Sequence, residues 1–128
     1  MQIEENISSL SFEVNHNSQI SNYVFASKFK DIIQSMLQNT SYKIINWNTN
    51  NDFIYAFIKD DYTDRLMYLF LANINIDKFA WRDHILLRTA SEIGHYNGKP
   101  YFYTKLKNLV ESLDNLNVIY NYSGSFGS

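Results

Sequence analysis

The sequence predicts a single α+β domain, in which a mostly antiparallel sheet of three to five strands packs against an N-terminal and a C-terminal helix. Three observations support this class. Apolar side chains recur every three or four positions in residues 19–38 and again after Thr104, as they do in amphipathic helices. Between these regions, short apolar and aromatic runs alternate with turns rich in Asn and Asp. The length of 128 residues fits one domain, which we expect to span residues 1–128.

The chain begins with a polar N-terminal segment, residues 1–17, followed by the first long helix. Within the segment, Leu10 to Val14 alternates apolar and polar side chains, which predicts a short strand. The helix is expected over Gln19 to Gln38. Ser18 and Ser21 are both candidates for its N-cap, because a serine hydroxyl accepts hydrogen bonds from the free amides of the first turn.

Four strands are expected between the two helices, because four short apolar or aromatic runs are each bounded by turn residues. The third of them is apolar on both faces, as central strands are. Residues 76–83 have an ambiguous pattern, for which a helical turn is one interpretation. The expected strands are Tyr42–Trp47, Phe53–Ile58, Arg65–Ile74 and His84–Thr89.

The last long element is a second amphipathic helix, and Thr104 is a candidate for its N-cap. Its apolar positions follow the spacing of one helix face. Beyond it, residues 118–122 predict one short strand, and residues 123–128, rich in Ser and Gly, predict a flexible tail. The apolar positions of the helix are Leu106, Leu109, Val110, Leu113 and Leu116.

The composition excludes several classes of protein. Hydrophobic residues make up 45% of the chain and aromatic residues 16%, which excludes intrinsic disorder. The chain has no cysteine, so it has neither disulfides nor thiolate metal sites. No stretch approaches the ~18 consecutive apolar residues of a membrane helix, and the N-terminus lacks the pattern of a secretory signal. We therefore expect a soluble, cytoplasmic protein without a membrane partner.

Charge is unevenly distributed along the chain. The formal net charge is −2, which argues against a general nucleic-acid binder. Residues 77–107, however, contain six basic and three acidic residues, a net charge of +3, while the rest of the chain carries −5. A basic segment in an acidic chain is a candidate binding region.

Within this basic segment, residues 88–105 interleave cations with aromatic rings, and we interpret them as a recognition loop. Gly94 and Asn97-Gly98 allow tight turns at positive φ, which suits an exposed loop. The competing interpretation is that some rings belong to the core and the lysines form a solvated rim. The candidate binding residues are Arg88, His95, Tyr96, Lys99, Tyr101, Tyr103 and Lys105.

No motif predicts a catalytic residue, a metal site or a cofactor. The four glycines form no phosphate-binding loop, and the histidines lack the paired spacing of zinc ligands. Asp60-Asp61-x-x-Asp64 is acidic but lacks the glycine and the terminal glutamate of a calcium loop, so we expect a solvated hairpin turn. One catalytic option remains, a metal-independent ribonuclease, which needs a base, an acid and cations at the phosphate. The residues that could fill these roles are His84, His95, Arg88, Lys99 and a tyrosine such as Tyr96 or Tyr103.

The expected function is that of a small non-enzymatic binding protein. It would act as a regulator or inhibitor by occupying a macromolecular partner, most readily a protein, and its size and composition suit a gene of a phage or other mobile element. The alternative is a single-stranded RNA or nucleic-acid binder, or the ribonuclease just described, acting through residues 84–107. A homodimer is a further option if the strand Phe53–Ile58 lies at a sheet edge.

Overall fold

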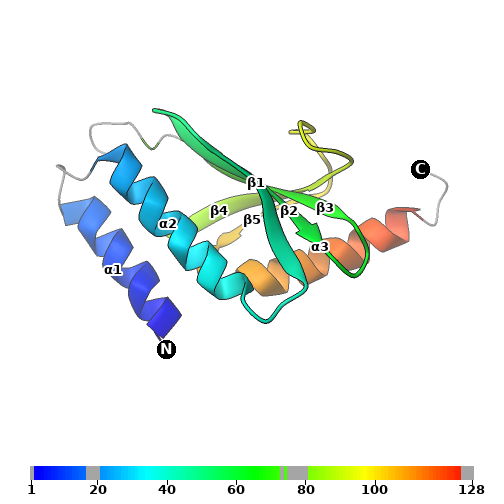
Figure 1. Ribbon diagram of the computed structural model, residues 1–128, viewed down its shortest axis with the longest axis horizontal. Coiled ribbons are helices and arrows are strands. Elements are labelled where there is room, and N and C mark those ends of the chain that lie inside the picture. Colours follow the sequence, from blue (N-terminus) through cyan, green and yellow to red (C-terminus); the bar gives the residue numbers. More distant parts are fainter. Residues whose placement is uncertain (1, 17–20, 73, 75–80, 125–128) are drawn as a thin grey trace.

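The α+β class expected from the sequence is confirmed by the computed structural model, which describes residues 2–16, 21–72, 74 and 81–124 (Figure 1). Five antiparallel strands form one sheet in the order β1-β2-β3-β4-β5. Among the described helices, none has the length and apolarity needed to cross a membrane. The elements are α1 (Gln2–His16), α2 (Asn22–Leu37), β1 (Tyr42–Thr49), β2 (Phe53–Asp60), β3 (Leu66–Ala72), β4 (His84–Ala90), β5 (Tyr101–Lys105), the 3-10 turn η1 (Leu106–Asn108) and α3 (Leu109–Gly124).

The register of the sheet gives it two different faces. Ile58 lies opposite Met67, and both side chains belong to the main core, which they share with side chains of all three helices. The next pair along these strands, Phe57 and Tyr68, belongs to a separate cluster without helical residues. Successive strand residues point to opposite faces, so the helices cover one face of the sheet. We call the other the open face.

The first long helix was predicted close to its observed bounds. It begins with Ser21 as N-cap, whose Oγ accepts a hydrogen bond from the backbone N–H of Val24 at 3.2 Å. This bond satisfies one of the amides that the first turn leaves free. Its buried side chains include Phe29, Ile33 and Leu37 of the apolar pattern that predicted the helix. Phe25, outside that pattern, is also buried, whereas Tyr23 and Val24, which belong to the pattern, are exposed.

The expected strand at Leu10–Val14 was wrong, because this segment is part of α1. Ile7, Leu10 and Val14 are buried, whereas Phe12 is 64% exposed. The buried positions are spaced three and four apart, so they form one stripe of a helix. The alternation of Leu10, Phe12 and Val14 therefore did not reflect a strand, and residues 2–16 of the polar N-terminal segment form a helix packed on α2.

The C-terminal part of the chain also differs from expectation. Residues 118–122 continue α3, which runs to Gly124, because the buried stripe of Leu109, Leu113 and Leu116 carries the helix onward and no breaker interrupts it. Thr104 is not a helix cap: it lies in β5, a fifth strand that the sequence did not predict. Residues 76–80 of the segment with an ambiguous pattern and residues 125–128 of the expected flexible tail lie outside the described residues.

The expected strand Phe53–Ile58 forms most of β2, and β2 is not an edge strand. It pairs with β1 on one side and with β3 on the other. The condition set for a homodimer through this strand, a place at the sheet edge, is therefore not met, because both of its hydrogen-bonding sides are occupied. The sheet ends instead at β1 and β5.

Phe29 and Trp81 form the centre of the main core. Phe29 is fully buried, and its ring meets that of Trp81 edge to face with centroids 5.5 Å apart. The Trp81 indole N–H donates to the carbonyl of His84 at 3.1 Å, and the Trp81 carbonyl accepts from Ser11 Oγ of α1 at 3.2 Å. This pair thus joins α1, α2 and the start of β4.

A buried polar network ties the β2–β3 turn to α3. Asp60 is only 3% exposed, and its Oδ2 accepts from Thr63 Oγ1 and from Asn117 Nδ2, both at 2.9 Å. The Asn117 Nδ2 group also donates to the hydroxyl of Tyr42 at 3.1 Å, and this hydroxyl donates to Asp114 Oδ1 at 2.6 Å. The turn at Asp60-Asp61-x-x-Asp64 is therefore not wholly solvated as expected, because its first aspartate points into the protein.

Hydrogen bonding decides the ionisation of this network. Burial by itself would raise the pKa of Asp60, but hydrogen bonds from Ser41, Thr63 and Asn117 outweigh it and hold the pKa below its usual value. Burial, and then the hydrogen bond to Asp114, raise the pKa of Tyr42. At neutral pH the network therefore contains an ionised Asp60 and a neutral Tyr42.

Replacing Phe29 by alanine should lower the free energy of unfolding by about 3–5 kcal/mol, because it leaves a cavity beside Trp81. Tyr23→Ala on the same helix is the control, since Tyr23 is 80% exposed, and its effect should stay below about 0.5 kcal/mol. Urea denaturation of both variants measures the difference. Equal effects at the two positions would contradict the assigned core.

Asp60→Asn should destabilise the protein by about 1–3 kcal/mol at pH 7, because it removes the charge that the buried hydrogen bonds favour. A lowered folded-state pKa means that this stabilisation is present above the unfolded pKa of about 4 and is lost as the pH falls below it. The difference between wild type and variant should therefore shrink between pH 5 and pH 2. The exposed Asp31→Asn is the control, and a pH-independent difference would argue against the assigned role of Asp60.

Candidate functional site

The centre of the open face is an aromatic cluster. Phe57, Tyr68 and Ala90 are its buried members, and half-buried side chains of β2 and β3 pack around them. Phe57 and Tyr68 face each other across the two strands with ring centroids 5.2 Å apart. The half-buried members are Tyr55, Leu66 and Phe70.

The loop between β4 and β5, residues 91–100, covers this cluster with one ring. Tyr96 lies 5.4 Å from Tyr68, 5.5 Å from Tyr55 and 5.9 Å from Phe57, measured between ring centroids. A hydrogen bond with Tyr96, followed by burial, raises the pKa of Tyr55. Burial raises the pKa of Tyr68 to about 12. Tyr96, expected as a binding residue, therefore also holds the loop on the sheet.

The far end of the same loop is attached to β4. Arg88 Nη1 donates to the carbonyl of Gly98 at 3.1 Å, and Thr89 Oγ1 donates to the carbonyl of Lys99 at 3.0 Å. Gly98 passes so close to Thr89 that a Cβ would collide with the Thr89 carbonyl. Gly94 has the positive φ, 100°, that the sequence predicted, whereas Gly98 is required by this close approach.

Beyond the loop, β5 presents two exposed tyrosines on the open face. Tyr101 is 52% exposed and Tyr103 is 72% exposed. The Arg88 guanidinium lies 4.5 Å from the centroid of the Tyr101 ring, and His84 stacks on Tyr103 with centroids 5.0 Å apart and an interplanar angle of 17°. Both rings are therefore supported by a side chain of β4 and remain accessible to a partner.

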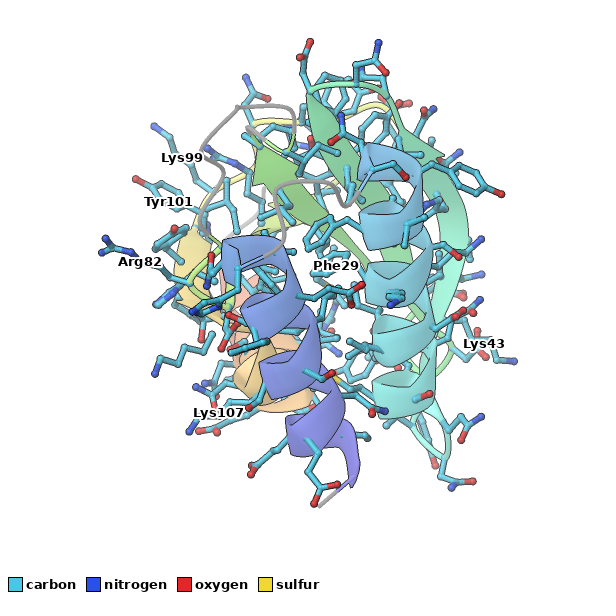
Figure 2. All side chains as sticks on the ribbon, turned by 90° about the vertical axis from the view of Figure 1, so that its left-hand side faces the viewer. Phe29, Lys43, Arg82, Lys99, Tyr101 and Lys107 are labelled. Carbon is cyan, nitrogen blue, oxygen red and sulfur yellow. The ribbon has the colours of Figure 1, made fainter. Side chains whose placement is uncertain are left out.

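Cations surround these rings. Lys99 is exposed two residues before the start of β5, and Lys105, also exposed, ends the strand. Figure 2 shows Lys99, Tyr101, Arg82 and Lys107 projecting from the same side of the molecule, whereas Lys43 projects from the opposite side. We call the surface formed by His84, Arg88, Lys99, Tyr101, Tyr103 and Lys105 the tyrosine edge.

Five of the seven candidate binding residues belong to the tyrosine edge: Arg88, Lys99, Tyr101, Tyr103 and Lys105. The register explains this grouping, because Arg88 lies opposite Tyr101 and His84 opposite Lys105. Tyr96 lies instead over the aromatic cluster. His95 is half-buried within the loop, where its Nδ1 accepts from the Ser91 backbone N–H at 3.0 Å.

The sequence indicated part of the open face but not its extent. Phe53, Tyr55 and Phe57 alternate in β2 and share one face, a pattern visible in the sequence. The cross-strand row that runs from Tyr55 through Phe70 and Leu86 to Tyr103 depends on the pairing of four strands. No local pattern gives that pairing.

The two histidines of the ribonuclease option lie at opposite ends of β4. His84 begins the strand, and its Nδ1 lies 2.7 Å from the carbonyl oxygen of Arg82. His95 lies in the loop that follows Ala90, the last residue of the strand. At about 3.3 Å per residue, the six steps from His84 to Ala90 span about 20 Å. The length of the strand therefore lies between His84 and the start of the loop that holds His95.

A hollow in the surface lies beside Tyr103, between β5 and α3. It has a volume of about 260 Å³ and a polar lining. In the described part of the chain, no three histidine or carboxylate side chains are grouped as a metal ion would require. The lining side chains beside Tyr103 are Phe102, Thr104, Asn108, Glu111, Ser112 and Asn115.

Comparison of the chain with protein-family models, with curated proteins and with solved structures finds no match. Its function is therefore inferred from the site alone.

Tyr96→Ala should lower the free energy of unfolding by about 2 kcal/mol. The variant loses three aromatic contacts, each of which contributes about 0.5–1.5 kcal/mol. Movement of the loop recovers part of this loss. Tyr96→Phe keeps the ring and should cost less than about 1 kcal/mol. Urea denaturation measures both, with the exposed Tyr62→Ala as a control. Equal losses for the alanine and phenylalanine variants would show that the ring contacts are not what holds the loop.

Proposed function

We propose that this protein is a small non-enzymatic binding protein that acts by occupying a macromolecular partner, and that the tyrosine edge is its contact surface. A regulator or inhibitor works in this way, since its effect requires contact and no chemical step. The observation that carries the proposal is the pair of exposed rings, Tyr101 and Tyr103, supported from below by Arg88 and His84.

Supported rings of this kind favour binding for an energetic reason. Tyrosine contributes a large contact area with few rotatable bonds, and Tyr and Arg are enriched among the residues that dominate binding energies. Because the rings of Tyr101 and Tyr103 already rest on β4 side chains, a partner loses little free energy in ordering them. The surrounding lysines would accelerate the approach of an anionic partner.

The positions of the histidines favour binding over catalysis. A metal-independent ribonuclease needs an acid and a base on either side of one phosphate, and His84 and His95 are separated by the length of β4. His84 is engaged in stacking on Tyr103, and His95 Nδ1 in the loop. Neither ring is placed to exchange a proton with the other.

Photo-crosslinking tests this proposal even though the partner has not been identified. Replacing Tyr103 by p-benzoylphenylalanine should give cross-linked macromolecules when the purified protein is mixed with lysate of its source cells. The same replacement at Tyr62, which is 91% exposed in the β2–β3 turn, is the matched control and should give few. Treatment of the products with nuclease or protease identifies the class of partner.

Equal cross-linking at the two positions, or none at Tyr103, would contradict a contact surface at the tyrosine edge. A second variant checks the result: Tyr101→Ala in the chain that carries the cross-linker at position 103 should reduce the yield, because the neighbouring ring contributes to the same contact.

A further inference from the structure

We propose that the partner of the tyrosine edge is single-stranded RNA, with bases stacked on Tyr101 and Tyr103 and phosphates held by the neighbouring cations. This inference rests on the proposed function, since it names the partner of that same surface. Proteins that bind unpaired strands combine exposed aromatic rings with a positively charged path along the backbone of the nucleic acid.

The rings have the spacing and orientation of a stacking platform. Tyr101 and Tyr103 are two residues apart on one strand and share a face of the sheet, so their Cα atoms are separated by about 6.6 Å. Each is supported on the β4 side, Tyr101 by the Arg88 guanidinium and Tyr103 by the stacked His84 ring. Two successive unstacked bases can therefore meet two rings that are already held in place.

The charges around the rings suit a polyanion. The ion pairs found among the described residues join Lys28 to Glu13, Lys43 to Asp61 and Lys59 to Asp64. None of these pairs uses a cation of the tyrosine edge. Phosphates of a bound strand would give such cations their counter-charge, with the release of condensed ions as part of the driving force.

Carboxylates limit this positive surface at one end. Glu4 and Asp83 line a hollow of about 190 Å³ together with Lys105 and Lys107. The other end of β5, toward Lys99, adjoins the loop, in which Glu92 is the single acidic residue. We therefore expect the phosphate backbone to follow β5 with its closest contact at Lys99.

A second copy of this chain is a poorer occupant of the same edge. If two β5 strands paired antiparallel about Tyr103, each Tyr101 would face a Lys105 of the other copy, and Lys99 and Lys107, which flank the strand, would be brought together at each end of the pair. Like charges placed opposite each other destabilise such a pair. The charge of this edge thus favours an anionic partner over self-association.

The polar hollow beside Tyr103 is the reason for naming RNA. Amide and hydroxyl groups of Asn108, Ser112 and Asn115 line it together with Tyr103 and the carboxylate of Glu111. Groups of this kind exchange hydrogen bonds with base edges and with the ribose 2′-hydroxyl, which DNA lacks. The hollow lies on the helix-covered side of β5, and because β5 is an edge strand, the sugar of a base stacked on Tyr103 can reach it around that edge.

Fluorescence anisotropy of the full chain with a labelled twelve-nucleotide oligouridine tests the proposal, with the matching deoxythymidine oligomer and an RNA duplex as comparisons. At 50 mM salt we expect binding of the RNA strand, at least several-fold weaker binding of the DNA strand and weaker binding again of the duplex. Tyr101→Ala with Tyr103→Ala should weaken RNA binding about tenfold or more, because each stacked base contributes substantially to affinity.

The lysines are tested by the salt dependence. The logarithm of the affinity should fall linearly with the logarithm of the salt concentration, and Lys99→Gln with Lys105→Gln should reduce the magnitude of this slope by about 1.4, or about 0.7 per lost phosphate contact. Lys43→Gln with Lys59→Gln is the matched control. These two lysines lie at the opposite end of the sheet in ion pairs, so the slope should not change.

The outcomes separate this inference from the proposed function. No binding of any oligonucleotide at 50 mM salt, together with protease-sensitive cross-links at position 103, would overturn RNA as the partner and leave a protein-binding surface. Equal binding of strand and duplex, or binding that the tyrosine variants do not weaken, would overturn the stacking site. Tighter binding of the DNA strand would overturn the choice of RNA. If the protein binds no oligonucleotide and position 103 gives no cross-link, both proposals are overturned.

Discussion

The antiparallel register between β2 and β3 decides which side chains enter which core, and the other elements depend on it. Ile58 and Met67 face each other beneath the helices, while the adjacent pair, Phe57 and Tyr68, faces the open side. A slip of one residue in either strand would exchange the two sets. The sheet is therefore apolar on both faces at its centre, and other parts of the chain must shield each face from water.

The two covers are of different kinds. On one face three helices pack around Phe29 and Trp81. On the other face the cover is the β4–β5 loop, which lays the ring of Tyr96 on the aromatic cluster and is attached at its far end by Arg88 and Thr89. Because this second cover is small, the β5 side of the open face remains exposed, and Tyr101 and Tyr103 lie there.

Charged side chains are also unevenly distributed over the protein. The tyrosine edge collects cations of β4, β5 and the loop, while Asp60, Asp61 and Asp64 lie at the β2–β3 turn. Of these three, Asp60 is buried in hydrogen bonds and stabilises the attachment of α3, and the other two pair with Lys43 and Lys59. A chain with a small net negative charge can thus present one locally positive surface.

The sequence by itself determined α2, the apolar stripe of α3, the approximate position of four strands and the concentration of positive charge in residues 77–107. These features follow from local periodicity and composition, which act over a few neighbouring residues. It also singled out Arg88, Tyr101 and Tyr103, which lie on one surface of the structure.

The tertiary structure decided what local patterns leave open. The segment Leu10–Val14 alternates like a strand, yet α1 forms because Ile7, Leu10 and Val14 together bury one helical stripe against α2. The short β5 exists because it pairs with β4, and Asp60 is buried because Asn117, distant in sequence, reaches it. The separation of His84 from His95 likewise comes from the strand between them. In each case the free energy comes from contacts between residues distant in sequence, which no short window of the sequence contains.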